Sequence, residues 1–368
     1  MKIKVSRTAF LGALQKLNSV IGTRTTLQIL SHVLIQAAEN KIIMVTTDLD
    51  IRIKSEIPAE IIETGETTVP AKKLYEIIRE MFSDDVYLDS DANHHMSIQG
   101  GNSKFKLLGL STEGFPIPMP STVIRSFSIV QGEFSRMLNL INYAVKVEED
   151  GNRKALTGIL ISTSDNSVTC VATDGKRLAL CEKGIDNFTG TDGEIVIPLK
   201  SALEVKSLIS NKSGVLKVEV ASNLVNFIFD DATTMTTKVI DEVYPNYRQV
   251  IPPSFSKQIK INRGLCSSVL SRVSLVVTEK NNFVKINFLP NKLEMSASST
   301  EIGDSTDYMD IEYDGNELNI CINPIFVRDP IQRMDSDNFV VKLNDGYNPI
   351  ALSDEDGFLY VVMPMRNR

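Results

Sequence analysis

A threefold internal repeat constrains the fold of this 368-residue chain more than any other feature of its sequence. Each copy opens with a short alternating strand, and an apolar stripe at helical spacing follows it. The stripes are Phe10, Ala13, Leu14 and Leu17; then Phe134, Met137, Leu138 and Ile141; then Leu265, Val269, Leu270 and Val273. The copies follow one another at intervals of about 125 residues, so the chain is expected to contain three similar units.

The segments behind each stripe also recur. Two alternating, strand-like runs follow, and the second run closes on a Thr-acid pair in every copy: Thr47-Asp48, Thr173-Asp174 and Thr300-Glu301. A second helical segment is then predicted behind a proline, at Pro70, Pro198 and Pro324, because proline suits the first turn of a helix. Further strands are predicted at 86–89 and 104–110, at 215–220 and 224–229, and at 339–343, 349–353 and 358–363.

This order of strand, helix, strands, helix, strands predicts an α+β fold, with two helices packed on antiparallel sheets in each unit. A chain of this length also exceeds what a single hydrophobic core usually holds. Two proline-rich segments, 115–120 and 244–253, mark the seams between copies. We therefore place three domains at 1–124, 125–253 and 254–368.

Composition excludes several classes of protein. With 42% hydrophobic and 23% charged residues the chain is of the soluble globular type, and no apolar run is long enough for a signal peptide or a membrane span. The four cysteines, Cys170, Cys181, Cys266 and Cys321, have no CxxC spacing. Neither a disulfide framework nor a cysteine-ligated zinc site is expected, and a reducing cytoplasm fits best.

Catalytic signatures are sparse. The chain has only three His and no nucleotide-binding, metalloprotease or hydrolase motif of known spacing. Three weak candidates remain, and each has a more ordinary explanation. His94-His95 is either a metal site or a polar turn, and Asp354 to Asp356 form either a cation site or a charged turn. Ser254 and Lys257 are either a serine hydrolase pair or a chance match in a linker.

Charge is unevenly distributed. The net charge of −7 argues against an acidic partner such as DNA, yet residues 1–24 contain five basic and no acidic residues. If the repeated helices share one side of the molecule, their cations form a surface suited to a phosphate backbone without base readout. The first helices would supply Arg7, Lys16, Arg24, Arg136, Lys146, Arg263 and Arg272, and the second helices Lys72, Lys73, Arg79, Lys200, Lys206, Arg328 and Arg333.

Two segments stand out by their chemistry: 171–178, in which a turn glycine is flanked by charged and apolar residues, and 361–366, which contains Met363-Pro364-Met365. Both are either edges of the core or walls of an adaptable apolar pocket, since methionine packs well against varied partners. The residues alone leave both explanations open.

The whole chain resembles the bacterial DNA polymerase III beta subunit family, the beta sliding clamps. The matching segments are Arg24 to Ile35, Ala172 to Leu178, Tyr244 to Pro252, Arg272 to Leu275 with Glu279 to Asn281, Glu301 to Gly303, and Met363 to Arg366. The resemblance implies three clamp-type domains per chain and a head-to-tail homodimer closed into a six-domain ring, with helices inside and sheets outside. It implies a DNA sliding clamp and processivity factor that encircles duplex DNA, and no catalysis, cofactor or metal. The implied partners are double-stranded DNA, the replicative polymerase catalytic subunit, the clamp loader, and other DNA polymerases and repair proteins that carry clamp-binding peptides, with no membrane.

The resemblance also implies three sets of site residues. A partner-peptide cleft would be formed by Leu156, Thr173, Gly175, Lys176, Arg177, Leu178, Pro245, Val250, Phe326, Pro349, Val362, Met363, Pro364, Met365 and Arg366. DNA would contact Arg24, Lys73, Arg153 and Lys200. The dimer interface would join Phe105 and Leu107 of one chain to Leu275 and Val276 of the other.

Some positions depart from the family pattern. Lys176, Gln249 and Gln28 stand where other residue types are usual, and the stretch from Lys146 to Asn152 is distinct. Two rival functions follow from the residues: a three-domain peptide-binding scaffold that does not encircle DNA, and a serine hydrolase using Ser254 and Lys257.

Overall fold

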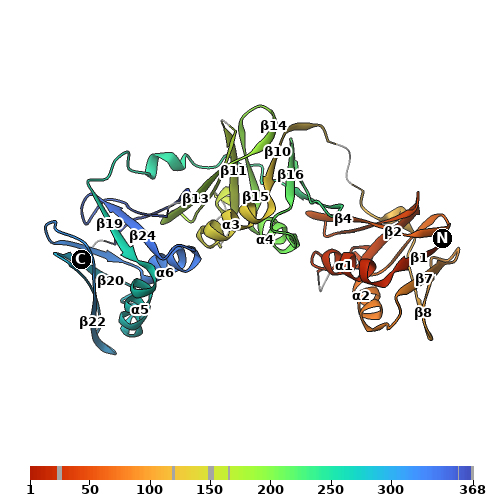
Figure 1. The fold of residues 1–368 in the computed structure, drawn as a ribbon, viewed down its shortest axis with the longest axis horizontal. Helices are drawn as coiled ribbons and strands as arrows, with labels where there is room; N and C mark the ends of the chain where they lie inside the picture. Colours follow the sequence, from red (N-terminus) through yellow and green to blue (C-terminus); the bar gives the residue numbers. More distant parts are fainter. Residues whose placement is uncertain (23–26, 118–120, 148–152, 165, 355, 366–368) are drawn as a thin grey trace. The chain divides into compact units, whose positions relative to one another are not determined.

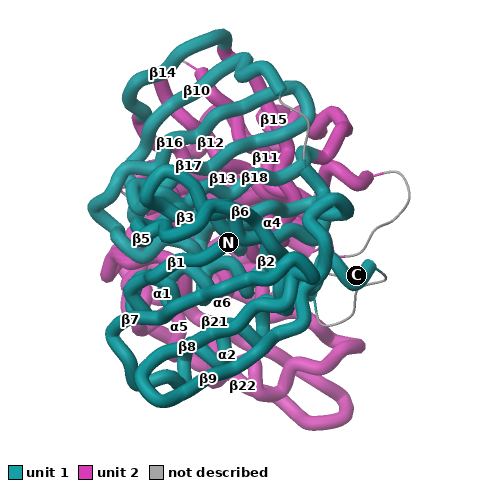
Figure 2. Tube along the Cα trace, turned by 90° about the vertical axis from the view of Figure 1, so that its right-hand side faces the viewer, with its two compact units in different colours: residues 1–132, 185–191, 203–239 teal, residues 133–184, 192–202, 240–368 magenta. Residues whose placement is uncertain are grey.

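The structure is a computed structural model that describes residues 1–22, 27–117, 121–147, 153–164, 166–354 and 356–365. Its contacts divide the chain into two compact units (Figure 2). The first unit holds residues 1–132, 185–191 and 203–239, and the second holds 133–184, 192–202 and 240–368. The central repeat is therefore shared between the two units.

The first unit contains two antiparallel sheets, in the strand orders β5-β1-β7-β8-β9 and β14-β10-β16-β17-β18-β4-β3-β2-β6. Helix α1 (Arg7–Leu17) lies beside α2 (Ala71–Glu80) (Figure 1). The strands are β1 Lys2–Ser6, β2 His32–Ala38, β3 Lys41–Thr47, β4 Ile51–Pro58, β5 Glu60–Glu63, β6 Gly65–Pro70, β7 Asp85–Ser90, β8 Met96–Gly100, β9 Ser103–Leu107, β10 Val123–Val130, β14 Asp186–Gly190, β16 Val215–Ala221, β17 Leu224–Ile228 and β18 Thr233–Lys238; the 3₁₀ turns are η1 Gln28–Ser31 and η2 Thr112–Gly114.

The second unit also contains two antiparallel sheets, in the orders β15-β11-β12-β13-β26-β25-β24-β19 and β22-β21-β20-β23. Helix α5 (Arg263–Val273) lies beside α6 (Pro324–Arg333). The strands are β11 Gly158–Ser164, β12 Ser167–Thr173, β13 Arg177–Gly184, β15 Gly193–Pro198, β19 Lys257–Asn262, β20 Val284–Leu289, β21 Lys292–Ser299, β22 Gly303–Asp310, β23 Leu318–Ile322, β24 Asn338–Leu343, β25 Ile350–Ser353 and β26 Phe358–Val362; the 3₁₀ turns are η3 Asn142–Ala144, η4 Lys154–Thr157, η5 Tyr247–Val250 and η6 Ser274–Val276. The two helices of the central repeat, α3 (Gln131–Ile141) and α4 (Leu199–Leu208), cross from one unit to the other.

Hydrogen-bonded ladders join neighbouring repeats within each unit. Strand β4 of the first repeat pairs with β18 of the second, and β13 of the second pairs with β26 of the third. In both cases the strand that follows the Thr-acid turn of one repeat receives the last strand of the next repeat. The sheets therefore run across the repeat boundaries, which explains why contacts group the chain into two units although the sequence repeats three times.

The predicted α+β repeat, with two helices in each copy, is confirmed. The apolar stripes of α1 and α3 are buried as expected, whereas the third stripe is corrected by one position: Leu265 is exposed and Cys266 is buried beside Val269. Helices α2 and α4 begin directly behind Pro70 and Pro198, as predicted, whereas α6 begins at Pro324 itself. The strands at β4–β6, β8, β13–β15, β18 and β22 were not predicted from the sequence.

Two of the basic residues expected to face DNA instead tie helices together. Arg7 donates through Nε to the carbonyl of Ile78 at 3.0 Å and through Nη2 to that of Arg79 at 2.6 Å. Arg263, the equivalent residue of the third repeat, donates to the carbonyls of Ser336 at 2.7 Å and Ile331 at 3.5 Å. Each guanidinium thus satisfies carbonyls at or just beyond the C-terminus of the second helix, where the helix dipole favours a cation.

Other first-helix cations are also engaged within the chain. Lys16 pairs with Asp231, Arg272 pairs with Asp307 at 2.6 Å, and Arg136 bonds three carboxylates, those of Asp335, Asp354 and Asp356. Arg7, Lys16, Arg136, Arg263 and Arg272 thus have partners within the chain, and the sequence did not indicate these structural roles.

Candidate functional site

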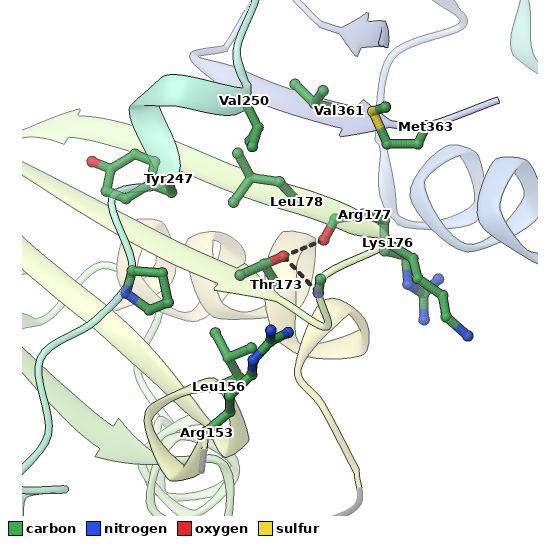
Figure 3. A pocket seen from close by; sticks show the side chains of 12 residues that line it. Arg153, Leu156, Thr173, Lys176, Arg177, Leu178, Tyr247, Val250, Val361 and Met363 are labelled. Carbon is green, nitrogen blue, oxygen red and sulfur yellow. Dashed lines mark hydrogen bonds between the residues drawn. The ribbon is translucent and has the colours of Figure 1, made fainter. Parts of the chain in front are cut away.

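A largely apolar pocket of about 340 Å³ lies in the second unit, at the ladder between β13 and β26 (Figure 3). Strand β13 and the turn before it provide one wall, β26 and the residue after it a second, and the turns η4 and η5 the remainder. The lining residues are Arg153, Leu156, Thr173, Gly175, Lys176, Arg177, Leu178, Pro245, Tyr247, Val250, Val361 and Met363.

The turn before β13 is built by the Thr-acid pair seen in the sequence. Thr173 Oγ1 donates to the carbonyl of Arg177 at 2.6 Å and accepts from the amide of Gly175 at 3.1 Å (Figure 3). Asp174 Oδ1 accepts from the amides of Lys176 and Arg177 at 2.9 and 3.0 Å. Gly175 has φ of 87°, a conformation that glycine adopts without strain. The turn is thus held by side-chain acceptors and places Leu178 in the wall of the pocket.

The pocket floor continues into the hydrophobic core. Leu156, Leu178, Tyr247 and Val361 belong to one buried cluster. Leu178 and Val361 are directly paired across the ladder, so the two strands present these side chains together. Met363, just beyond β26, is half exposed and forms part of the rim. An apolar floor with a flexible thioether at the rim can receive apolar side chains of different shapes.

The guanidinium of Arg177 stabilises the turn beside the pocket, because its hydrogen bonds go to groups of the protein itself. Its guanidinium donates to Asp174 at 3.0 Å, to Asp329 of α6 at 2.6 Å and to the carbonyl of Tyr143 at 2.8 Å. The ring of Phe326 lies 4.8 Å from the guanidinium carbon. Burial disfavours the charged form, but the hydrogen bond to Asp329 and the neighbouring negative groups outweigh it and raise the pKa of Arg177.

Nine of the fifteen residues expected in the partner-peptide cleft line this pocket: Leu156, Thr173, Gly175, Lys176, Arg177, Leu178, Pro245, Val250 and Met363. Phe326, Pro349, Val362, Pro364 and Met365 are not among its lining residues, and Arg366 lies outside the described residues.

The geometry explains two of these differences. Val362 is buried on the opposite side of β26 from Val361, because successive strand residues face opposite ways. Met365 donates its amide to the carbonyl of Cys321 at 2.7 Å, and this bond ties the chain to the end of β23.

Three lining residues were not assigned to the pocket from the sequence: Arg153, Tyr247 and Val361. The alternation along 358–363 could have identified Val361, because it lies on the same side of the strand as Met363. Nothing in the local sequence separates Tyr247 from its neighbours in the proline-rich seam. Arg153 was expected at DNA, and the structure places it on the wall of this pocket (Figure 3).

The remaining expected DNA residues are distributed over both units. Lys73 lies on α2 and pairs with Glu76 at 2.6 Å, and Lys200 lies in the first turn of α4. Arg24 lies outside the described residues. Of the expected interface residues, Phe105 and Leu107 lie on β9, and Leu275 and Val276 lie on η6.

The weak catalytic candidates do not assemble into a site. Lys257 begins β19 and donates to the carbonyl of Asn344 at 3.1 Å, so it lies on a strand and not on a helix that could aim it at Ser254. Asp354 and Asp356 are bound to Arg136, and His95 lies 3.4 Å from Asp91 in a turn. Within the described residues, no group of three or more His, Cys, Asp or Glu is arranged to hold a metal ion.

The four cysteines lie in the interior of the fold. All four are free and buried, although Cys170 and Cys181 lie opposite each other on β12 and β13. Burial raises the pKa of the Cys181 and Cys266 thiols to about 12. No helix in the described part of the chain is long and apolar enough to cross a membrane.

Three models of one family together match most of the chain, and each matches one repeat. They describe the N-terminal, central and C-terminal domains of the DNA polymerase III beta subunit, at residues 1–120, 128–246 and 248–366. The matched family is a non-catalytic processivity subunit of a DNA polymerase. The chain belongs to the DNA polymerase III beta subunit family, the beta sliding clamps.

Individual relatives match from end to end. The beta sliding clamp of Caulobacter vibrioides is 30% identical over 100% of both chains. Among solved structures, the DNA polymerase III subunit beta of Pseudomonas aeruginosa has a TM-score of 0.94 at 26% identity, and the clamp of the same organism bound to griselimycin has 0.93 at 26% identity; each covers 100% of both chains.

The Arg177 network makes a prediction about stability. Replacing Arg177 by Met leaves the half-buried Asp174 and Asp329 without their shared cation, which should cost about 3 kcal/mol in the free energy of unfolding. Urea denaturation checks this. The matched control Lys176→Met, at the exposed neighbouring position, should change the free energy by less than about 0.5 kcal/mol. Equal stabilities of the two variants would contradict a stabilising role for the network.

Proposed function

We propose that two copies of this chain close head to tail into a six-domain ring around duplex DNA, and that partner proteins bind the apolar pocket of the second unit. Each chain would contribute three domains, at 1–124, 125–253 and 254–368. The proposal builds on membership of the sliding clamp family. The single observation that carries it concerns two edge strands, β9 and β22. Pairing of β9 with β22 would repeat the strand pairing seen between neighbouring repeats.

Of the three equivalent strand pairings that the repeat allows, the described part of the chain forms two. The strand after each Thr-acid turn is β4, β13 or β22, and the last strand of each repeat is β9, β18 or β26. Strand β4 pairs with β18 and β13 pairs with β26, whereas β22 and β9 each end a sheet with no further strand in the described part of the chain. A second copy of the chain would supply the missing ladder, from its β9 to β22.

The two edges have complementary charge. Strand β9 carries Lys104 and Lys106, both exposed, and β22 carries Asp304, Asp307 and Asp310. Opposite charges on paired strands stabilise the pair, and an uncovered edge of this length invites pairing. Because the two edges are different surfaces, the contact is made twice in a closed dimer.

Apolar groups beside the edges support the same pairing. Phe105 on β9 is 40% exposed, and Leu275 on η6 is 78% exposed. Leu275 lines a pocket of about 240 Å³ with Leu270, Ser271, Ser274, Pro324, Ile325 and Arg328. We infer that the Phe105 ring of one chain fills this pocket of the other, with Leu107 and Val276 beside it.

Reversing the charges on β9 and on β22 tests whether these two strands pair between chains. Lys104→Glu with Lys106→Glu places like charges in both contacts of the dimer and should raise its dissociation constant at least tenfold. Asp304→Lys with Asp310→Lys should do the same, while an equimolar mixture of the two variants should form heterodimers, because each contact then joins opposite charges. Sedimentation velocity measures all three states.

The control is Lys212→Glu with Lys217→Glu, which changes the net charge equally away from β9 and should leave the dimer intact. Failure of the mixed variants to associate, with both variants folded, would count against pairing of β9 with β22.

A ring explains how an acidic protein can act on DNA. Non-specific affinity for DNA is only about 10⁻⁴ to 10⁻⁶ M at physiological salt, so affinity alone does not keep a polymerase on its template. A closed ring stays on the duplex by topology, and a few phosphate contacts from Arg24, Lys73, Arg153 and Lys200 suffice. The net charge of −7 then limits unproductive contacts with DNA. A cytoplasmic location fits this role.

The pocket suits short peptides of exchanging partners. Its volume is at the small end of the range for ligand pockets, and its walls are mostly apolar. Burying about 400 Å² of apolar area at about 25 cal/mol/Å² gives about 10 kcal/mol, which association costs reduce to micromolar affinity. We propose that the replicative polymerase, the clamp loader, other DNA polymerases and repair proteins use this pocket in turn.

Topological linkage is the decisive test of the function. We expect the protein, loaded on nicked circular DNA by a bacterial clamp loader with ATP, to stay on the circle and to leave when the DNA is linearised. Gel filtration of the labelled protein with DNA measures retention. Release at one salt-dependent rate from cut and uncut circles would favour the scaffold that does not encircle DNA.

The pocket is tested with griselimycin, the molecule bound in the Pseudomonas aeruginosa structure. We expect it to bind this chain, and Met363→Asp to weaken binding at least tenfold because the charge would be buried against the ligand. Isothermal titration calorimetry gives the affinities. The control Tyr347→Ser alters an exposed side chain that does not line the pocket and should have no effect. Unchanged affinity in Met363→Asp would place the ligand elsewhere.

A further inference from the structure

A second pocket, of about 180 Å³, lies in the first unit at the ladder between β4 and β18. Its lining residues are Thr47, Leu49, Asp50, Ile51, Arg52, Pro116, Ile117, Leu224, Thr236 and Lys238. None of the cleft, DNA or interface residues expected from the sequence belongs to it.

The turn beside this pocket has the same construction as the turn beside the first. Thr47 Oγ1 donates to the carbonyl of Ile51 at 2.9 Å and accepts from the amide of Leu49 at 3.0 Å. Asp48 Oδ1 accepts from the amides of Asp50 and Ile51 at 3.0 and 2.7 Å. Leu49 has φ of 81°, close to the 87° of Gly175 at the equivalent position. The repeat therefore builds the same frame twice.

The partner strand also corresponds. Thr236 of β18 is paired with Arg52, as Val361 of β26 is paired with Leu178. Lys238 takes the place of Met363, two residues further along. The frame is shared, but its chemistry differs, because a cation and polar groups replace apolar side chains.

Arg52 is the residue that gives this pocket a specific chemistry. Its Nε is buried and has no hydrogen-bond partner among the described residues. Burial lowers the pKa of Arg52, and no negative neighbour raises it again. Among the lining residues of this pocket, Asp50 is the one acidic residue, and it pairs with Lys238 at 3.1 Å. Leaving part of a half-buried guanidinium without a partner is costly, and a carboxylate in the pocket would bond to its terminal nitrogens and supply the missing counter-charge.

Exposed apolar side chains lie in the same pocket. Leu49 is 45% exposed and Ile117 is 69% exposed, and Pro116 and Leu224 also line the wall. A free phosphate would gain nothing from these groups, whereas a peptide with a carboxylate next to an apolar side chain would use both.

We propose that this second pocket binds an acidic, apolar peptide segment, whose carboxylate bonds to Arg52 and whose neighbouring apolar side chain packs on Leu49 and Ile117. The site lies wholly within the first unit and does not depend on the function proposed for the first pocket. It would let a partner with two peptide segments hold the chain at two places, with the second segment selected by its charge.

The test uses acetyl-Gly-Leu-Asp-Leu-Gly-amide and the same peptide with Asn in place of Asp, titrated into full-length protein with labelled isoleucine methyl groups. We expect the Asp peptide to shift the methyl resonances of Ile51 and Ile117. Arg52→Gln and the Asn peptide should each weaken binding at least tenfold, and the two changes together should weaken it no further, because they remove the same bond.

Lys54→Gln is the matched control, since it removes one charge from the same strand outside the pocket and should bind the Asp peptide as the unaltered protein does. Equal binding of the Asp and Asn peptides would overturn the proposal without relying on any variant, so a poorly folded Arg52→Gln would not obscure the result. Shifts confined to Ile251, beside the first pocket, or inorganic phosphate binding as tightly as the Asp peptide, would overturn it too.

Discussion

Backbone pairing between one repeat and the next is the interaction on which the rest of this structure depends. The β4·β18 and β13·β26 ladders join sheets across repeat boundaries, and both pockets lie at these ladders. A ladder of this kind needs two strands from different repeats, so the last repeat is left with an open edge at β22 and the first with an open edge at β9. Ring closure by a second copy is the simplest way to satisfy both edges.

The two pockets share a backbone framework but differ in the side chains that line them. The same Thr-acid turn stands beside both pockets, yet Leu178 lines one and Arg52 lines the other. The first pocket is apolar and is held by Arg177, whose three guanidinium nitrogens each donate a hydrogen bond, whereas the second contains a cation whose Nε has no partner among the described residues. The repeat thus provides two similarly framed pockets whose lining residues differ in chemistry.

Charge on this chain acts locally. Several cations that the sequence suggested for DNA serve the fold: Arg7 and Arg263 bind carbonyls at the ends of the second helices, and Arg136 joins three carboxylates. Their periodic positions were visible in the sequence, but a repeated structural role produces the same periodicity as a repeated binding role. Only the hydrogen bonds distinguish the two, because they show where each guanidinium is engaged.

The sequence by itself determined the threefold repeat, the two helices per copy and the Thr-acid turns of the first two copies, because helical spacing and turn chemistry are local properties of the chain. In the third copy the expected pair, Thr300-Glu301, is one position too late: Ser299 Oγ accepts from the amide of Glu301 at 3.3 Å, as Thr47 and Thr173 do from the residue two positions on. It also indicated nine residues of the first pocket through resemblance to the clamp family. The tertiary structure decided which strands pair across repeats, that Val361 and not Val362 faces the pocket, and that Arg52 lies buried in a second one. These features depend on contacts between segments up to about 185 residues apart, which no local pattern specifies.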